Sequence, residues 1–340
     1  MTTAGRIALD VMGGDNAPRQ ILEGALRATD PTRDDGLPAD RILLVGPKAE
    51  LSPILAEHNA LDRFAILDSL EVIGMHEEPG TALRAKPKAT IPMCIEAVRS
   101  GDAAAAVSMG NTGAMVGAAT IILRTLPGVR RPGIAVTSNL TGKPTTLLDM
   151  GANAAPRGSD LVEYAIMGAA LQEGVLGVKD PRVGLLNIGE EDKKGTRLTK
   201  EARDLLLESG LNFVGNIEPD GIFTDCAEVI VTDGFTGNVV LKLIEGFGSF
   251  LLDKIVREGK RVGQPLPDEV LSQAMRSVDY SEYGGALLLG VNGVVVIGHG
   301  RSDSNAVHNA LKVAAKDLDS DVNGRAVESL AERAKQRPTP

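Results

Sequence analysis

The sequence predicts a three-layer α/β/α sandwich built on a mostly parallel sheet. Short runs rich in Val, Ile and Leu alternate with longer segments of helical periodicity along the chain. This alternation is typical of a parallel sheet that helices cover on both faces. Glycine is frequent, at 39 of 340 residues, as expected where many strands turn sharply into helices.

The apolar runs define the expected strands, because each is short and bounded by glycine, proline or polar residues. We expect strands at Arg6–Val11, Arg41–Val45, Phe64–Leu67, Ala103–Val107, Gly133–Thr137, Thr145–Leu148, Val183–Asn187, Asn212–Gly215, Glu228–Val231, Ala286–Leu289 and Val294–Ile297. Apolar residues at helical spacing mark the segments between them. We expect helices at Pro18–Ala28, Ala49–Glu57, Ile91–Arg99, Thr112–Leu123, Ser159–Gln172, Thr196–Glu208, Gly237–Arg257, Asp268–Ser277 and Ser304–Ala315.

The length of the chain bounds its domain organisation. A chain of 340 residues with 43% hydrophobic content holds more than most single cores. We therefore expect residues 1–324 to form one α/β/α unit, either as two lobes with a cleft between them or as one large sheet with an inserted lobe. The charged tail over 325–340 is expected to fray.

Composition excludes several classes of protein. The net charge of −9 and an aromatic content of 3% argue against a nucleic-acid partner. Cys94 and Cys226 are too far apart in sequence to suggest a zinc pair or a disulfide framework, so a reducing cytoplasm is expected. The sequence shows neither a signal peptide nor an apolar run of about 18 residues, which leaves peripheral contact with a membrane open.

The end of the first strand carries an unusual set of residues. Asp10 lies in the strand, and Gly13, Gly14 and Asp15 follow before the proline at Pro18. The carboxyl end of the first strand is a common ligand site in open α/β sheets, and the glycines permit close approach to the backbone. The simpler interpretation is a tight turn in which an acid only caps the next helix.

Five later strand ends carry the same kind of residues, glycines together with an acid or an amide. They are Ser108-Met-Gly-Asn-Thr-Gly-Ala114, Asp149-Met-Gly-Ala-Asn153, Gly189-Glu-Glu-Asp-Lys-Lys-Gly195, Thr232-Asp-Gly-Phe-Thr-Gly-Asn238 and Gly298-His-Gly-Arg-Ser-Asp303. Where the strands are parallel, their carboxyl ends meet at one edge of the sheet. The repetition favours a ligand site over a series of unrelated turns.

Two of these loops suit an anion. Asn111, Thr112 and Gly113 open a helix of small residues, and free backbone N–H groups at a helix start bind anions. Without a ligand, the same residues would form an ordinary N-cap. Lys193 and Lys194 supply positive charge suited to phosphate, although one of them could simply be solvated. The sequence contains neither the P-loop pattern nor a dinucleotide fingerprint.

His299 lies between two glycines at a strand end, which leaves the imidazole accessible for acid–base or hydrogen-bonding work. An exposed loop histidine is the alternative. His58, His76 and His308 have no comparable setting and are interpreted as surface residues. The carboxylates lack the spacing of a metal cage, so no metal site is expected.

The segment Thr236–Arg261 predicts a long amphipathic helix. Apolar residues recur at helical spacing, and the end is basic through Lys254, Arg257, Lys260 and Arg261. A core or dimer helix is one interpretation. The other is a surface that meets a membrane or an acidic protein.

Taken together, the loop motifs resemble the bacterial PlsX family of phosphate acyltransferases. The similarity extends in order from about Arg6 to about Ala315, through Asp10-Val-Met-Gly-Gly-Asp-Asn-Ala-Pro18, Ser108-Met-Gly-Asn-Thr-Gly-Ala114, Leu148-Asp-Met-Gly-Ala-Asn153, Asn187-Ile-Gly-Glu-Glu-Asp-Lys-Lys-Gly195, Thr232-Asp-Gly-Phe-Thr-Gly-Asn238, Asp279-Tyr-Ser-Glu-Tyr-Gly-Gly-Ala-Leu-Leu-Leu-Gly290 and His299-Gly-Arg-Ser302.

The resemblance implies transfer of a fatty acyl group from acyl carrier protein to inorganic phosphate. The product, acyl phosphate, would feed phospholipid synthesis through a downstream membrane glycerol-3-phosphate acyltransferase. The resemblance also implies a Rossmann-like fold similar to phosphotransacetylases and to the isocitrate- and isopropylmalate-dehydrogenase-like group. A homodimer near the inner face of the membrane is expected, with no cofactor.

The motif positions suggest a role for each candidate residue. Asn111, Thr112, Gly113 and Lys194 would hold phosphate, with Lys193 as their neighbour, and His299 would assist the oxyanion or the departing thiolate. The residues expected to orient these groups or to line the substrate site are Asp10, Gly13, Gly14, Asp15, Asp149, Asn153, Asn187 and Asp233. We expect direct attack by phosphate without an acyl-enzyme, because no activated Ser or Cys is evident.

Docking of the carrier needs a local positive patch, because both proteins are acidic and like net charges slow their encounter. The basic helix end at Lys254, Arg257, Lys260 and Arg261 is the first candidate, and Arg130 and Arg131 are the second. Three other functions stay open: a phosphotransacetylase acting on short acyl-CoA, a nicotinamide-dependent decarboxylating dehydrogenase, and a non-catalytic scaffold that recruits lipid enzymes.

Overall fold

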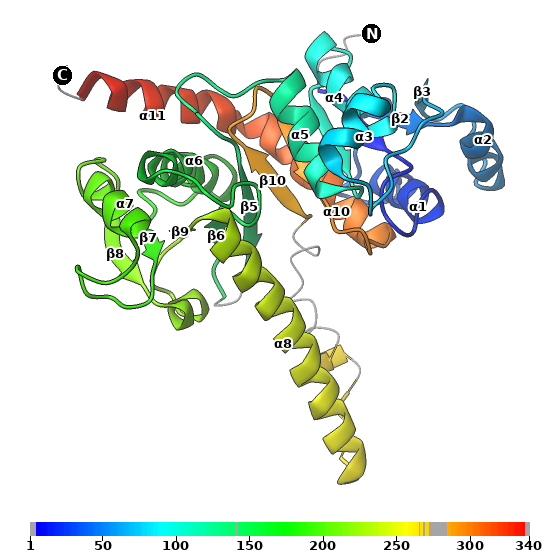
Figure 1. Cartoon of the computed structure of the whole chain (residues 1–340). Helices are drawn as coiled ribbons and strands as arrows, with labels where there is room; N and C mark the ends of the chain where they lie inside the picture. The colour runs from blue at the N-terminus through cyan, green and yellow to red at the C-terminus, as the bar shows by residue number, and fades with distance from the viewer. Residues whose placement is uncertain (1–4, 140–141, 265, 268, 272–283, 337–340) are drawn as a thin grey trace. The chain divides into compact units, whose positions relative to one another are not determined.

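The computed structural model describes residues 5–139, 142–264, 266–267, 269–271 and 284–336 (Figure 1). The chain divides into two compact units. Unit 1 comprises Met1–Pro132 and Tyr283–Pro340, and unit 2 comprises Gly133–Glu282. Both units alternate strands with helices, so the predicted α/β class is confirmed.

The strands of unit 1 are β1 (Ile7–Asp10), β2 (Ile42–Gly46), β3 (Ala65–Asp68), β4 (Ala105–Ser108), β10 (Ala286–Leu289) and β11 (Val294–Ile297). They lie in the order β3-β2-β1-β4-β11-β10. All neighbours are parallel except β10 and β11. The helices of this unit are α1 (Arg19–Ala28), η1 (Ala39–Arg41), α2 (Lys48–Glu57), α3 (Pro79–Ala85), α4 (Thr90–Ser100), α5 (Thr112–Ile122), α10 (Ser304–Ser320) and α11 (Val322–Gln336).

The strands of unit 2 are β5 (Gly133–Ser138), β6 (Thr145–Leu148), β7 (Val183–Leu186), β8 (Phe213–Ile217) and β9 (Val229–Val231), in the order β5-β6-β9-β7-β8. Only β5 and β6 are antiparallel. The helices are α6 (Gly158–Leu176), α7 (Arg197–Leu207), η2 (Pro219–Phe223) and α8 (Gly234–Arg261). The inner strands β6, β7 and β9 are buried along their whole length, as in a sheet covered on both faces.

The observed strands match the predicted ones, with every bound within two residues. The helix expected at Asp268–Ser277 falls mostly outside the described residues. The short helix α3 was not predicted, because its sequence opens on Pro79-Gly80 and shows little periodicity. Its start is instead defined by the Glu78 carboxylate, which accepts hydrogen bonds from the backbone N–H groups of Gly80 and Thr81.

We expected the tail over 325–340 to fray, but the structure shows a helix as far as residue 336. Helix α11 begins at Val322, so the boundary expected after Gly324 lies inside a helix. Val322, Ala326 and Leu330 recur every four residues and are all buried. Burial of this apolar stripe, rather than local charge, decides the structure of the helix.

The start of α8 packs directly on the turn that follows β6. A Cβ atom on Gly237 would lie 1.9 Å from the backbone oxygen of Asp149, and one on Gly234 would lie 2.7 Å from its Oδ2. Both positions therefore require glycine. None of the helices in the described part of the chain combines the length and apolar character needed to cross a membrane.

We predict that Gly237→Ala destabilises the protein by about 1–3 kcal/mol, because the new methyl group would displace a backbone carbonyl. Gly246→Ala in the same helix is the matched control, since a Cβ atom there would meet nothing within 4 Å. That control should be neutral or stabilising by about 0.5–1 kcal/mol. Urea unfolding measures both changes, and equal stabilities would contradict the proposed close approach.

Helix α10 buries two titratable side chains. His308 is 2% exposed and is therefore not the surface residue expected from the sequence. Burial and then the charges of Arg33 and Lys312 lower its pKa. Asp317 is 4% exposed, and burial, followed by the charge of Asp321, raises its pKa to about 7.

We predict that Asp317→Asn stabilises the protein more at pH 8 than at pH 5. The folded chain binds the Asp317 proton more tightly than the unfolded chain. This contribution to stability is therefore complete below the ordinary pKa of 3.8 and is lost as the pH rises through about 7. The free energy of unfolding at the two pH values tests the prediction. Asp319→Asn on the same helix, at a side chain 69% exposed, is the control for helix charge. If the free energy of unfolding of the wild type does not change with pH, the Asp317→Asn prediction is contradicted.

Candidate functional site

The carboxyl ends of β1, β4 and β11 bring three loops together in unit 1, because these neighbouring strands are parallel. The backbone N–H of Asp15 donates to the Gly300 oxygen at 2.7 Å, and that of Gly298 donates to the Ser108 oxygen at 2.9 Å. Gly14 has φ +90°, and a Cβ atom there would lie 3.0 Å from the Met109 oxygen. The loops of Gly13–Asp15, Asn111–Gly113 and His299 thus adjoin one another, as the sequence predicts.

A buried carboxylate organises the first two of these loops. Asp10 Oδ1 accepts from the Met12 N–H at 3.1 Å, and Oδ2 accepts from the Ser108 hydroxyl at 2.7 Å. The Ser108 hydroxyl oxygen in turn accepts from the Gly110 N–H at 2.9 Å. Burial raises the pKa of Asp10, while the hydrogen bonds from Ser108 and the loop backbone lower it. Ser108 was not singled out from the sequence, although its place at the strand end was the available signal.

Both the oxygen and the nitrogen of the Asn111 side-chain amide form hydrogen bonds to the backbone. Its Oδ1 caps α5 by accepting from the Ala114 N–H at 3.0 Å. Its Nδ2 lies within 3.0–3.3 Å of the carbonyl oxygens of Gly74, Met75 and Glu77. Asn111 therefore fixes both the start of α5 and the loop 74–77. Sequence reasoning missed this loop, which carries the exposed His76.

The start of α5 remains open to a ligand. Thr112 and Gly113, its first two residues, are exposed, and N–H groups in the first turn of a helix have no partner within the helix. A Cβ atom on Gly113 would lie 2.6 Å from Pro79 Cγ, so α3 lies directly beside this helix start. The arrangement suits an anion with several oxygens.

His299 is half-buried, and its Nδ1 accepts from the Arg301 N–H at 3.1 Å. A neutral ring in this setting carries its proton on Nε2, which is then a hydrogen-bond donor. The loop that carries His299 is tied back to the first loop. Asn16 Nδ2 lies 3.1 Å from the carbonyl oxygens of both Arg301 and Ser302.

In unit 2, the parallel strands β6, β9 and β7 likewise place their carboxyl ends together. Asp149 is fully buried and accepts from the N–H groups of Ile134, Gly151, Ala152 and Asn153 at 2.7–3.0 Å. Burial raises its pKa, and these backbone donors oppose the shift.

Two further polar side chains predicted at this edge also build loops. Asn153 Nδ2 donates to the Tyr164 hydroxyl at 2.8 Å. The Asp233 carboxylate caps α8 by accepting from the N–H and hydroxyl of Thr236 at 2.9 and 2.7 Å. Like Asn111, these residues fix the position of backbone at the edge of the sheet.

Two asparagines hold the loop that carries Lys193 and Lys194. Asn187 Nδ2 lies 3.3 Å from the Lys194 oxygen, and Asn216 Nδ2 lies 3.2 Å from the Glu191 oxygen. Asn216 was missed from the sequence, because it lies inside β8 rather than after it. Both lysine side chains are exposed. Lys194 Nζ forms an ion pair with Glu191 Oε1 at 3.9 Å, and both side chains are exposed.

The first docking candidate lies far from these loops. Lys254 is 20 residues beyond Gly234 in α8, or about 30 Å along the helix axis. Arg257 and Arg261 form ion pairs with Asp253 and Glu258 of the same helix, at 3.9 and 2.7 Å. Lys260 is exposed near the end of the helix. The second candidate, Arg130 and Arg131, is exposed in unit 1.

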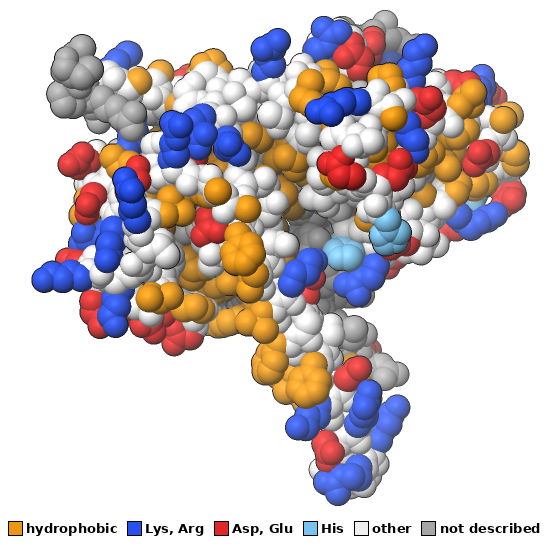
Figure 2. All heavy atoms as spheres, in the orientation of Figure 1, with side chains coloured by type: hydrophobic (Ala, Val, Ile, Leu, Met, Phe, Trp, Pro, Cys, Tyr) orange, Lys and Arg blue, Asp and Glu red, His pale blue; other side chains and the backbone are white. Residues whose placement is uncertain are grey.

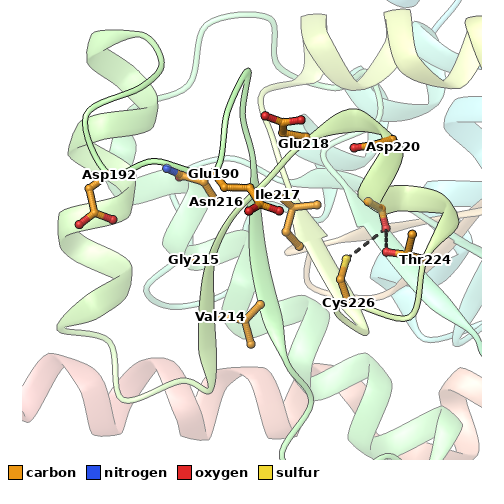
Figure 3. Close-up of a pocket in the computed structure, with 11 residues that line it drawn as sticks. Glu190, Asp192, Val214, Gly215, Asn216, Ile217, Glu218, Asp220, Thr224 and Cys226 are labelled. Carbon is orange, nitrogen blue, oxygen red and sulfur yellow. Dashed lines mark hydrogen bonds between the residues drawn. The ribbon is translucent and has the colours of Figure 1, made fainter.

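A pocket of about 420 Å³ lies at the end of β8 in unit 2 (Figure 3). Glu190, Asp192, Glu218 and Asp220 give its lining four carboxylates. Within the described residues, these and other His, Cys, Asp and Glu side chains form no group that could hold a metal ion. The negative lining makes the pocket unsuitable for phosphate.

Comparison with known proteins agrees with the motifs. A family profile described as "Fatty acid synthesis protein" matches residues 5–325. The chain is 43% identical to "Phosphate acyltransferase" of Halothermothrix orenii over 327 residues, covering 94% of this chain and 96% of the relative. It is 42% identical to "Phosphate acyltransferase" of Trichlorobacter lovleyi over 335 residues, covering 96% and 95%. The resemblance drawn from the loop motifs is thus confirmed.

Solved structures show the same fold at lower sequence identity. A phosphotransacetylase from Streptococcus pyogenes matches with a TM-score of 0.61 and 18% identity, covering 93% of this chain and 95% of that one. The EutD phosphotransacetylase from Staphylococcus aureus matches with a TM-score of 0.60 and 16% identity, covering 92% and 94%. The predicted similarity to the phosphotransacetylase fold is confirmed.

We predict that Asn111→Asp releases the loop 74–77 but keeps α5 capped, because a carboxylate still accepts from the Ala114 N–H but cannot donate. Asn111→Ala should lose both functions and destabilise the protein by about 1–2 kcal/mol more than the Asp variant. Hydrogen exchange of the loop peptide and urea unfolding separate the two effects. Unchanged exchange in Asn111→Asp would show that the amide does not hold the loop.

Proposed function

This chain belongs to the fatty acid synthesis protein family, and we propose that it transfers a fatty acyl group from acyl carrier protein to inorganic phosphate. The observation that carries the proposal is the alignment of relatives named phosphate acyltransferase over 94–96% of the chain. The aligned region includes every strand-end loop described above.

The proposed reaction is a direct displacement. A phosphate oxygen attacks the thioester carbonyl carbon, and the carbonyl oxygen becomes an oxyanion. The C–S bond then breaks, the electron pair leaves with the carrier thiolate, and acyl phosphate is the product. The enzyme must hold phosphate against the carbonyl and provide donors for the developing negative charge.

Groups at the carboxyl ends of the strands suit these tasks. We assign phosphate binding to the start of α5, through Thr112 and Gly113, and to Lys194, with Lys193 as its neighbour. His299 would donate from Nε2 to the oxyanion or to the departing thiolate. Asn111 contributes through the helix start that it caps.

The remaining candidate residues are positioning residues in this proposal. Gly13, Gly14 and Asp15 would allow close approach of the substrate to the backbone. The other members, whose side chains hold the loops, are Asp10, Asp149, Asn153, Asn187 and Asp233.

Direct attack is favoured by the state of the two thiols. Cys94 is fully buried, and burial raises the pKa of its thiol well above 9.0. The Cys226 Sγ donates to the Gly221 oxygen at 3.1 Å beside an acidic pocket. Cys94 is therefore not placed to form the thiolate that a covalent acyl intermediate would need, and Cys226 is engaged in a hydrogen bond to the backbone.

A homodimer is also part of the proposal, and α8 supports it. Leu243, Phe247 and Phe250 of this helix are 58–65% exposed, and Figure 2 shows hydrophobic side chains along it. An exposed apolar face of this kind commonly meets a second chain. Peripheral membrane contact and a downstream membrane glycerol-3-phosphate acyltransferase are proposed from the family resemblance.

The deciding experiment incubates the purified protein with palmitoyl-acyl carrier protein and inorganic phosphate. Free carrier thiol and hydroxylamine-reactive acyl phosphate are followed together. Equal, phosphate-dependent release of both supports the proposal, and trapping of an acyl-enzyme would exclude direct attack. Turnover of short acyl-CoA without turnover of the acyl carrier would indicate the phosphotransacetylase alternative.

We predict that Lys194→Ala raises the KM for phosphate about 10-fold or more, because it removes a cation from the proposed phosphate site. His299→Ala should instead lower kcat about 100-fold through loss of a donor to the oxyanion or thiolate. Initial rates at varied phosphate separate the effects. Lys179→Ala, at an exposed lysine of unit 2, is the control. An equal loss in that control would contradict the assignments.

A further inference from the structure

Helix α7 and the loop before it carry a run of exposed cations in unit 2. Lys193, Lys194, Arg197 and Lys200, here called the α7 basic face, all have exposed side chains. Arg197 and Lys200 are three residues apart in a helix and therefore neighbours on its surface. Figure 2 shows Lys and Arg side chains, with Asp and Glu among them, at the left of the view, where α7 lies.

Three of the four charges of this face are available to a partner. Lys193, Arg197 and Lys200 form no ion pair with a carboxylate in the described part of the chain, whereas Lys194 pairs with Glu191 at 3.9 Å. Arg203, farther along α7, differs because it pairs with Asp192 and Asp204 and is only 17% exposed. Asp192 therefore already pairs with a cation of its own unit.

The face begins at the proposed reaction site. Asn187 and Asn216 hold the loop that carries Lys194 at the carboxyl edge of the sheet, and α7 starts directly after that loop. A carrier bound here would have its thioester arm beside the residue assigned to phosphate. The basic end of α8 lies about 30 Å along the helix from Asp233. Two of its four cations are already paired within the helix.

We propose that the α7 basic face docks the acidic acyl carrier protein. The choice of acyl carrier protein as the partner rests on the proposed function. The whole chain has a net charge of −9, so association with an acidic protein needs a local positive surface. The face supplies that surface next to the loop where the thioester must react.

The test reverses charge at two residues outside the proposed chemistry. Arg197→Glu with Lys200→Glu is compared with Arg257→Glu with Lys260→Glu on α8, which changes the net charge by the same amount. Binding of fluorescent holo-acyl carrier protein is measured by anisotropy, with or without turnover. Initial rates are measured with palmitoyl-acyl carrier protein and with palmitoyl-pantetheine, which has the same thioester but no protein.

We expect the α7 double variant to weaken carrier binding and raise the KM for the acylated carrier at least 10-fold. Its turnover of palmitoyl-pantetheine should be unchanged, and the salt dependence of carrier binding should decrease. The α8 variant should behave as wild type. Unchanged binding in the α7 variant, or equal weakening in the α8 variant, overturns the proposal.

Two further outcomes separate docking from chemistry. Loss of palmitoyl-pantetheine turnover in a folded α7 variant would place the face in the reaction and overturn the docking role. If wild type binds the carrier through this face but releases no acyl phosphate from either substrate, the proposed function fails while the docking inference stands.

Discussion

Buried carboxylates at strand ends hold the loops of this protein in place. Asp10 in unit 1 and Asp149 in unit 2 each lie at the carboxyl edge of a sheet and accept hydrogen bonds from the loops around them. Burying a charge is unfavourable unless donors surround it, and the raised pKa values of both groups show that cost. The loops supply the donors, so loop geometry and carboxylate burial depend on each other.

The same constraint explains where glycine is required. A Cβ atom on Gly13 would lie 2.6 Å from Asp10 Oδ2, and one on Gly234 would lie 2.7 Å from Asp149 Oδ2. Backbone must approach each carboxylate closely for its N–H groups to reach the oxygens. The glycines are therefore part of the hydrogen-bonded turns and not simply flexible links between strand and helix.

This division of labour leaves few side chains free for chemistry. The polar groups of Asn111, Asn187 and Asp233 form hydrogen bonds that cap helices or hold loops. The exposed groups at these edges are the first residues of α5 and the lysines of one loop. Rigid support with a few free donors is what stabilisation of a developing oxyanion requires.

The sequence by itself determined the strand positions, the fold class and the family. Strands are short and apolar, and each strand-end motif is local in the chain, so both can be read without knowledge of packing. It could not show that α11 is a helix as far as Gln336, because the burial of Val322, Ala326 and Leu330 depends on a surface built by distant residues.

The tertiary structure also decided which polar side chains hold loops through hydrogen bonds and which are exposed. The three carbonyl partners of Asn111 lie 34–37 residues away, and Asn216 reaches a loop 25 residues before it. Hydrogen bonds between segments so far apart depend on strand order, which no local pattern encodes. The physical reason is that sequence periodicity reports which face of an element is buried, but not which neighbour buries it.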